Sequence, residues 1–270
     1  MTQVSHPQQS ASLVDYARQG YVATITLNRP EKRNAFNADL VRALHKALTE
    51  FDRDPDARVA ILVGAGPAFS SGADVLERQQ RSPDDFSRLG GPQEPDAHTG
   101  DLLVRSVNWK PVIAAVHGVV MGLGIGVAFE CELVVADIDT RFQITETPRG
   151  LGGARFWSLL HTCGGAALAT EVALTGRFFS AEEARQAGLV CKVAAQGKVL
   201  EAARELADQI AANPPLSVQC TVRVRRWLLD QAQRTAVAFT EPMKLYLTDD
   251  FRESVAAHVE KRKPKEFKGR

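Results

Sequence analysis

The stretch "KPVIAAVHGVVMGLGIG" (residues 110–126) joins an apolar segment to a turn with three alternating glycines. Residues 112–116 are all apolar, which predicts a strand buried on both faces. Gly122, Gly124 and Gly126 then predict a turn that opens a helix, and we call residues 122–126 the downstream glycine turn. A strand, a glycine turn and a helix in this order indicate an α/β fold with its functional site at the strand ends.

A dinucleotide-binding loop would need the pattern GxGxxG between a strand and a helix. Val127 stands where the third glycine belongs, so this stretch does not fit that pattern. Two interpretations remain open for the glycines. The free N–H groups at the start of a helix can hold an oxyanion, or the glycines merely permit close packing.

A second turn of the same kind lies earlier in the chain, after the apolar run "RVAILVGAG" (residues 58–66). The following segment, "PAFSSGADVLER" (residues 67–78), contains Ser71-Gly72-Ala73-Asp74, which we call the upstream glycine turn. Two such turns at the ends of neighbouring strands can aim two N–H groups at one carbonyl oxygen. The pair therefore favours the oxyanion interpretation.

The rest of the chain predicts an α/β core followed by helices. Alternating residues in "YVATITLNRP" predict a strand, and Asn37 is a candidate N-cap of the next helix. From residue 156 onward the pattern is almost entirely helical. We expect a flexible N-terminus at 1–12, an α/β core at 13–200 and a helical region at 201–270, with one mobile loop at 78–100.

The composition excludes several classes of function. A net charge of +1 over 270 residues provides no general field for nucleic acid or an anionic membrane. The longest apolar stretch is interrupted by His117 and by glycines, so we expect no membrane span. The four cysteines are scattered without a CxxC pair, which predicts reduced core cysteines, no metal site and a cytoplasmic protein.

Several segments together resemble the enoyl-CoA hydratase/isomerase family, also called the crotonase family. They are "LNRPEKRNAFN" (27–37), "GAGPAFSSGADV" (64–75), "KPVIAAVHGVVMGLGIG" (110–126), "ADIDTRFQITETPRGL" (136–151), "FFSAEEARQAGLVCKV" (178–193) and "DDFRESVAAHVEKRKPKEFKGR" (249–270). The resemblance implies a ClpP/crotonase-like spiral of ββα units with a C-terminal helical region for trimerisation. It also implies a homotrimer or a hexamer of two trimers, with the basic tail near a neighbour's CoA site and not on RNA.

The resemblance further implies an acyl-CoA substrate, with coenzyme A as part of that substrate and no other cofactor. Its two oxyanion donors would be the backbone N–H groups of Ala73 and Leu123, each contributing on the order of 3 kcal/mol to an enolate-like transition state. Leucine replaces the usual glycine at position 123 but keeps the N–H. The expected thioester and CoA contacts are Lys32, Arg33, Ala35, Ala73, Asp74, Val75, Leu76 and Leu123, with Asp74 also bracing its loop.

Hydratases of this family resemble one another in using two glutamates, and here the position of the first is Gly126. Glu146 occupies the second position. Glu130 lies one helical turn beyond Gly126, about 6 Å along the axis, and would substitute only if that turn were rearranged. One partly buried glutamate can take a proton from one carbon and return it to another. We therefore expect 3-enoyl to 2-enoyl-CoA isomerisation.

Other interpretations stay open at this point. They are a hydratase that holds water by other groups, a thioester or carbon–carbon hydrolase, and a member that binds acyl-CoA or a partner without catalysis. We expect residues 75–105 to shape the acyl pocket. His117 is expected to make a structural hydrogen bond, and Phe156 and Trp157 to form pocket wall or core. Arg149 and Arg155 either brace loops or face a carboxylated acyl chain.

Overall fold

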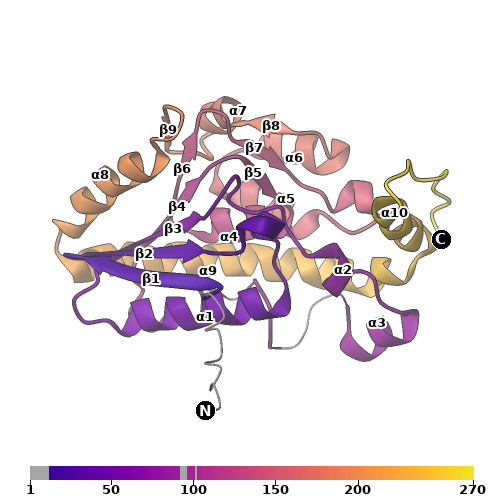
Figure 1. Ribbon diagram of the computed structural model, residues 1–270, viewed down its shortest axis with the longest axis horizontal. Helices are drawn as coiled ribbons and strands as arrows, with labels where there is room; N and C mark the ends of the chain where they lie inside the picture. Colours follow the sequence, from indigo (N-terminus) through magenta and orange to yellow (C-terminus); the bar gives the residue numbers. More distant parts are fainter. Residues whose placement is uncertain (1–11, 92–95, 101) are drawn as a thin grey trace, which may run out of the picture.

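The computed structural model describes residues 12–91, 96–100 and 102–270. Apart from Ser12, the expected flexible N-terminus lies outside these residues. The main sheet has six strands in the order β1-β2-β3-β4-β6-β9 (Figure 1). All neighbours pair in parallel except β1 and β2, which form an antiparallel hairpin. The strands are β1 (Val14–Gln19), β2 (Val22–Leu27), β3 (Val59–Gly64), β4 (Val112–Val116), β6 (Leu133–Asp137) and β9 (Lys192–Ala194).

The central strands are continuously apolar because both faces of the sheet are covered. Every residue of β3 is buried, and alternate side chains enter two different apolar clusters. Ile61 packs in the cluster that includes α8 (Val199–Ala211), while Leu62 packs in the cluster that includes α1 (Ala38–Arg53). The strands predicted from the apolar runs at 58–66 and 112–116 are thus confirmed. The Asn37 cap is confirmed as well, because its side chain accepts from the Leu40 N–H at 2.9 Å.

A second, three-stranded sheet lies beyond the ends of the central strands. It contains β5 (Val119–Met121), β7 (Arg141–Gln143) and β8 (Phe179–Ser180), in that order. β5 follows β4 after only two residues and leads directly into the downstream glycine turn and α4 (Leu123–Glu130). This short sheet therefore fixes where the turn lies relative to the upstream glycine turn, which follows β3.

The C-terminal half is mainly helical, as expected. Its elements are α5 (Ala154–Cys163), α6 (Ala166–Thr175), α7 (Ala181–Gln186), α8, α9 (Pro215–Thr240), the 3-10 turns η3 (Glu241–Met243) and η4 (Leu245–Leu247), and α10 (Asp249–Val259). The long helix α9 runs along the molecule beside the sheet, and α10 lies at one end with the C-terminus (Figure 1). The short strands β5, β7 and β8 were not predicted from the sequence, because strands of two and three residues carry too little alternation to detect.

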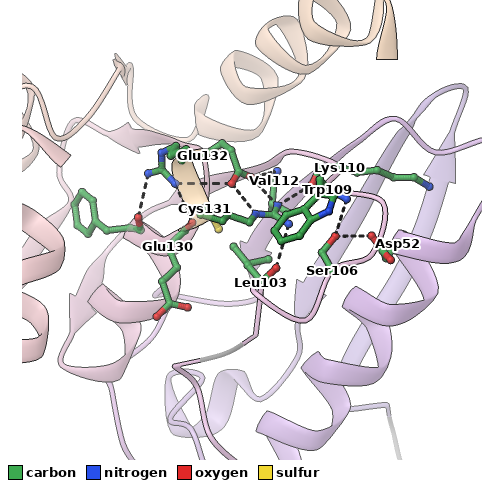
Figure 2. A network of polar contacts seen from close by, with 12 residues as sticks. Asp52, Leu103, Ser106, Trp109, Lys110, Val112, Glu130, Cys131 and Glu132 are labelled. Carbon is green, nitrogen blue, oxygen red and sulfur yellow. Dashed lines mark hydrogen bonds and ion pairs between the residues drawn. The ribbon is translucent and has the colours of Figure 1, made fainter. Parts of the chain in front are cut away.

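A buried ion pair connects α9 to the sheet. The guanidinium of Arg226 is 2% exposed and donates to both carboxylate oxygens of Glu132, at 2.8 and 2.9 Å. Glu132 Oε2 also accepts from the N–H of Val112 at 2.8 Å, and Arg226 donates to the Lys110 carbonyl at 2.7 Å (Figure 2). The helix is therefore joined to the residues that open β4, the strand that leads to the downstream glycine turn.

The expected loop at 78–100 is interrupted by a helix. α2 (Val75–Arg78) ends there, and α3 (Pro83–Leu89) follows. Ser82 caps α3 by accepting from the Asp85 N–H at 3.1 Å, and Pro83 is preorganised for the first helical position. Phe86 is buried against the ring of Phe251 in α10. Residues 92–95 of the stretch lie outside the described residues.

The cysteines are free, but the expectation that they are core residues holds only for part of them. Cys131 is buried and Cys163 is half-buried, whereas Cys191 and Cys220 are exposed. Sequence patterns did not separate these cases because an amphipathic helix or a short strand places cysteines on either face. Among the described residues, we find no helix whose length and apolar character would suffice to cross a bilayer.

Candidate active site

The upstream glycine turn is held by a bridge to the segment before α1. The N–H of Phe36 donates to the Gly72 carbonyl at 2.7 Å, and the N–H of Asp74 donates to the Phe36 carbonyl at 3.0 Å. In a parallel bridge of this kind, the bonded C=O and N–H groups belong to the residues before and after Ala73. Ala73 itself directs its N–H to the side opposite Phe36. The Ala73 N–H therefore points away from Phe36, and Ala73 lines a cavity of about 210 Å³.

The downstream glycine turn begins where β5 ends. The Gly122 N–H donates to the carbonyl of Gln143 at 3.0 Å, and Gly122 has a φ of 47°, which favours glycine. α4 starts at the next residue, and the first N–H groups of a helix have no partner within it. Within residues 12–91, 96–100 and 102–270, the N–H groups of Leu123 and Ala73 make no hydrogen bond.

The two turns lie against each other. The N–H of Met121 donates to the carbonyl of Ser70 at 3.1 Å, and a Cβ placed on Gly72 would lie 2.8 Å from the Met121 carbonyl oxygen. Only glycine therefore fits at position 72 without pushing the turns apart. Ala73 and Leu123 line the same cavity, which we call the active cavity.

Glu146, the glutamate that the sequence indicated as catalytic, also lines the active cavity. It opens the 3-10 turn η2 (Thr147–Arg149), and a Cβ on Gly122 would lie 2.9 Å from its Oε1. In the described part of the chain its Oε2 is buried without a hydrogen-bond partner. Burial disfavours the charged form and raises the pKa of Glu146 to about 7. Such a carboxyl can both take and return a proton near neutral pH.

We expect Glu146→Gln to stabilise the protein increasingly as the pH rises. The pKa of Glu146 is about 7 in the folded chain, against an ordinary 4.5, so the folded state binds more protons between these values and loses stability as the pH rises through them. The loss is complete above about pH 7 and amounts to about 3.5 kcal/mol at most, at about 1.4 kcal/mol per pKa unit. Glutamine carries no such charge. Urea unfolding at about pH 5 and 8 measures the gain, and an equal gain at both would contradict the buried carboxyl.

The position of the missing acid is occupied by an aromatic ring. A Cβ placed on Gly126 would lie 2.7 Å from Cε1 of Phe156, which is 4% exposed and lines the active cavity. A glutamate at 126 would therefore collide with this ring. The glycine and the phenylalanine, thirty residues apart in the sequence, together make this part of the cavity wall apolar.

Glu130 does not take the place of that acid. It is 5% exposed, and its Oε1 accepts from Nη2 of Arg155 at 2.8 Å. It is not among the described residues that line the active cavity, whereas Arg155 is. Figure 2 shows the Glu130 carboxylate pointing away from Glu132, which is bound to Arg226. The rearranged turn considered from the sequence is thus not present.

Of the expected run from Ala73 to Leu76, only Ala73 lines the active cavity among the described residues. Asp74 accepts from Arg29 Nη1 at 2.7 Å and caps α2, so its expected role as a brace is confirmed. Val75 is buried in an apolar cluster under α2, and Leu76 is 56% exposed.

The other expected CoA contacts lie beside the upstream glycine turn. Lys32 ends the 3-10 turn η1 (Pro30–Lys32), and Arg33 follows with a left-handed φ of 50°. Both side chains are exposed, and the Arg33 carbonyl accepts from the Ser71 N–H at 2.9 Å. Ala35 is 7% exposed and lies between this pair and the turn in sequence. Two exposed cations are thus tied closely to the turn.

Three further residues behave largely as the sequence suggested. Nε2 of His117 lies 3.0 Å from the Gly66 carbonyl oxygen, which confirms its structural hydrogen bond. Trp157 donates from Nε1 to the Thr170 hydroxyl at 3.1 Å. Arg149 is half-buried at η2 and donates to Gln79, and burial lowers its pKa while Glu146 opposes that shift.

Contrary to the expectation, the described part of residues 75–105 contributes little to the walls of the active cavity. Of residues 75–105, only Arg78 and Gln79 line the active cavity in the part of the chain that the structure describes. Most of the opposite wall comes from the end of α9, η3 and η4. These residues are Thr240, Glu241, Lys244, Leu245 and Tyr246. Glu241-Pro242 is a sequence signal for the end of α9, but nothing local indicates that the segment returns to the glycine turns.

Comparisons with known proteins agree with this geometry. The family model described as enoyl-CoA hydratase/isomerase matches residues 17–270. Enoyl-CoA hydratase EchA19 of Mycobacterium tuberculosis is 35% identical over 92% of this chain and 93% of its own length. Short-chain-enoyl-CoA hydratase of Clostridium acetobutylicum is 31% identical over 94% and 97%. The crystal structure of carnitinyl-CoA hydratase from Mycobacterium avium is 31% identical, with a TM-score of 0.80 and coverage of 97% of this chain and all of that one.

Proposed function

The chain belongs to the enoyl-CoA hydratase/isomerase family, and from this premise we propose that it moves the double bond of an enoyl-CoA with Glu146 as its single proton carrier. Its fold is the expected crotonase-like α/β fold with a C-terminal helical region. The observation that carries the proposal is the pairing of Gly126 with Phe156. Among the described residues that line the active cavity, Glu146 and Glu241 carry carboxyl groups, and Glu146 is the one that lies against Gly122 of the downstream glycine turn.

In the proposed reaction, the thioester oxygen accepts hydrogen bonds from the N–H groups of Ala73 and Leu123. Glu146 removes a proton from C2 of a 3-enoyl-CoA, and the charge of the resulting dienolate spreads to the thioester oxygen, where the two donors stabilise it. The protonated Glu146 then delivers the proton to C4, which yields the 2-enoyl-CoA. The buried carboxyl suits both steps because its pKa is close to neutral.

The rest of the substrate is coenzyme A, and we propose no other cofactor. In this proposal Lys32 and Arg33 bind its phosphates, and their exposed side chains beside the upstream glycine turn support that role. We also propose a cytoplasmic homotrimer or hexamer. A row of exposed apolar side chains on α9, Leu216, Val224 and Leu228, supports an association of subunits. Analytical ultracentrifugation tests this, and a monomer at micromolar concentration would contradict it.

Reversible hydration of a 2-enoyl-CoA is the second candidate function. The relatives named above are hydratases, which favours it. With Phe156 beside Gly126, the water would have to be positioned by Glu146 and by groups other than a second carboxylate. Hydrolysis of the thioester would instead release free CoA.

Mass spectrometry in deuterated water separates these reactions. The pure protein is incubated with 3-enoyl- and 2-enoyl-CoA esters of several chain lengths. We expect the two isomers to interconvert with exchange of carbon-bound hydrogen for deuterium and without addition of water. Rapid formation of the 3-hydroxyacyl-CoA would show that the reaction is hydration and not isomerisation. Release of free CoA would indicate hydrolysis. Glu146→Gln serves as the control for contaminating host enzymes.

A further inference from the structure

The active cavity is lined by more positive charge than a hydrocarbon chain needs. Besides the reacting end, its lining includes the cations Arg78, Arg155 and Lys244 and one further carboxylate, Glu241. Pockets for uncharged acyl groups are lined mainly by apolar side chains, and placing a cation in a partly dry site is costly. The lining thus has more cations than carboxylates, and this excess of positive charge favours an anionic group in the ligand.

Arg155 is the best-positioned of these cations. Its Nη2 donates to Glu130 at 2.8 Å, and its Nε donates to Gln233 of α9 at 2.9 Å. The side chain is only 15% exposed, and that of Glu130 is 6% exposed. A buried ion pair of this kind contributes little net stability because desolvation offsets the attraction. It does hold the planar guanidinium in one orientation at the cavity wall, next to Phe156.

Lys244 supplies a second charge from the opposite wall. It joins η3 to η4 with a left-handed φ of 43°, a conformation that non-glycine residues adopt only at a cost. Its Nζ lies 3.5 Å from the hydroxyl of Tyr246, and that hydroxyl donates to Glu241 at 3.3 Å. All three residues line the active cavity. The backbone strain thus occurs where the lysine reaches the cavity.

We propose that the acyl chain bound in the active cavity carries a second, ionised carboxylate, which Arg155 binds while Lys244 adds positive charge at the rim. This inference rests on the proposed function, because it assigns the acyl end of the CoA ester to the active cavity. A guanidinium held by Glu130 and Gln233 can still offer N–H groups to a carboxylate, and planar, charge-assisted pairing is the geometry in which arginine recognises one.

Isothermal titration calorimetry with saturated CoA esters tests the inference without depending on turnover. Hexanoyl-CoA and adipoyl-CoA have the same number of acyl carbons and differ in whether the chain ends in a methyl group or a carboxylate. We expect adipoyl-CoA to bind about tenfold tighter or better, as for one charge-assisted hydrogen bond, and the advantage to shrink at high salt. Equal or tighter binding of hexanoyl-CoA would overturn the inference.

Two variants and one control locate the effect. Lys244→Met should lose several-fold of the preference for adipoyl-CoA over hexanoyl-CoA. Lys261→Met is the matched control, since Lys261 is also an exposed lysine with a left-handed φ, of 55°, and lies outside the lining of the active cavity. Arg155 is tested in the double variant Glu130→Gln/Arg155→Gln, which leaves no buried carboxylate unpaired, and there the preference should disappear.

The alternative role of these cations is to bind the phosphates of CoA. In that case Lys244→Met and the double variant would weaken the binding of adipoyl-CoA, hexanoyl-CoA and free CoA by the same factor. That result would overturn the inference. Failure of the proposed function has a different signature. If the protein prefers adipoyl-CoA but turns over no enoyl-CoA, the proposed reaction alone is contradicted. If it isomerises enoyl-CoA esters without a preference for carboxylated chains, the inference alone is contradicted.

Discussion

Replacing Glu146 by glutamine is expected to lower kcat by about 10²- to 10⁴-fold, the range that a positioned general acid–base contributes. Glutamine keeps the shape of the side chain but can neither accept the C2 proton nor return it. Because the carboxyl touches the downstream glycine turn and does not hold it by a hydrogen bond, the two N–H donors should stay in place. Binding of a saturated acyl-CoA, measured by calorimetry, should therefore change little.

The pH profile provides a second readout of the same residue. With a pKa of about 7, Glu146 is mostly protonated in acid, so kcat/KM should rise with pH and level off above about 7. Glu182→Gln is the control, since Glu182 is an exposed glutamate on α7, and its kcat should stay within about twofold of the wild type. Near-normal turnover in Glu146→Gln would rule out Glu146 as the proton carrier.

The sequence was sufficient for those parts of the fold that depend on neighbouring residues. The buried strands could be predicted because β3 and β4 are covered on both faces and therefore read as unbroken apolar runs. The two glycine turns could be predicted because positive φ angles and close backbone approach require glycine at Gly72 and Gly122. Their meeting in space follows from parallel strands, which end at the same edge of a sheet.

The parts that the sequence could not provide are contacts between distant segments. Gly126 indicated a missing acid, but only the structure shows the ring of Phe156 in its place. The pairing of Glu130 with Arg155 joins α4 to the first turn of α5, and no spacing rule predicts it. Glu146 alone looks like any loop glutamate. Its raised pKa comes from burial by other elements, which a local pattern does not contain.

The second large effect is expected for Gly72→Ala, which should lower kcat by about 10²- to 10³-fold, the amount typical of losing one oxyanion donor. The added Cβ would lie 2.8 Å from the Met121 carbonyl oxygen, well inside van der Waals contact, and that atom is backbone and cannot swing aside. The upstream turn must then move away from β5. The Ala73 and Leu123 N–H groups would no longer converge, although both donors remain chemically intact.

The strain of a left-handed alanine has to be separated from this displacement. Gly188→Ala provides the comparison, because Gly188 has a φ of 79°, close to the 93° of Gly72, and a Cβ there meets no atom within 4 Å. Both variants should lose similar stability from backbone strain, on the order of 1 kcal/mol, while only Gly72→Ala loses turnover. Steady-state kinetics and thermal unfolding of the two proteins decide the matter. If kcat fell equally in both, the loss would come from general destabilisation, and the convergence of the two turns would not be what stabilises the enolate.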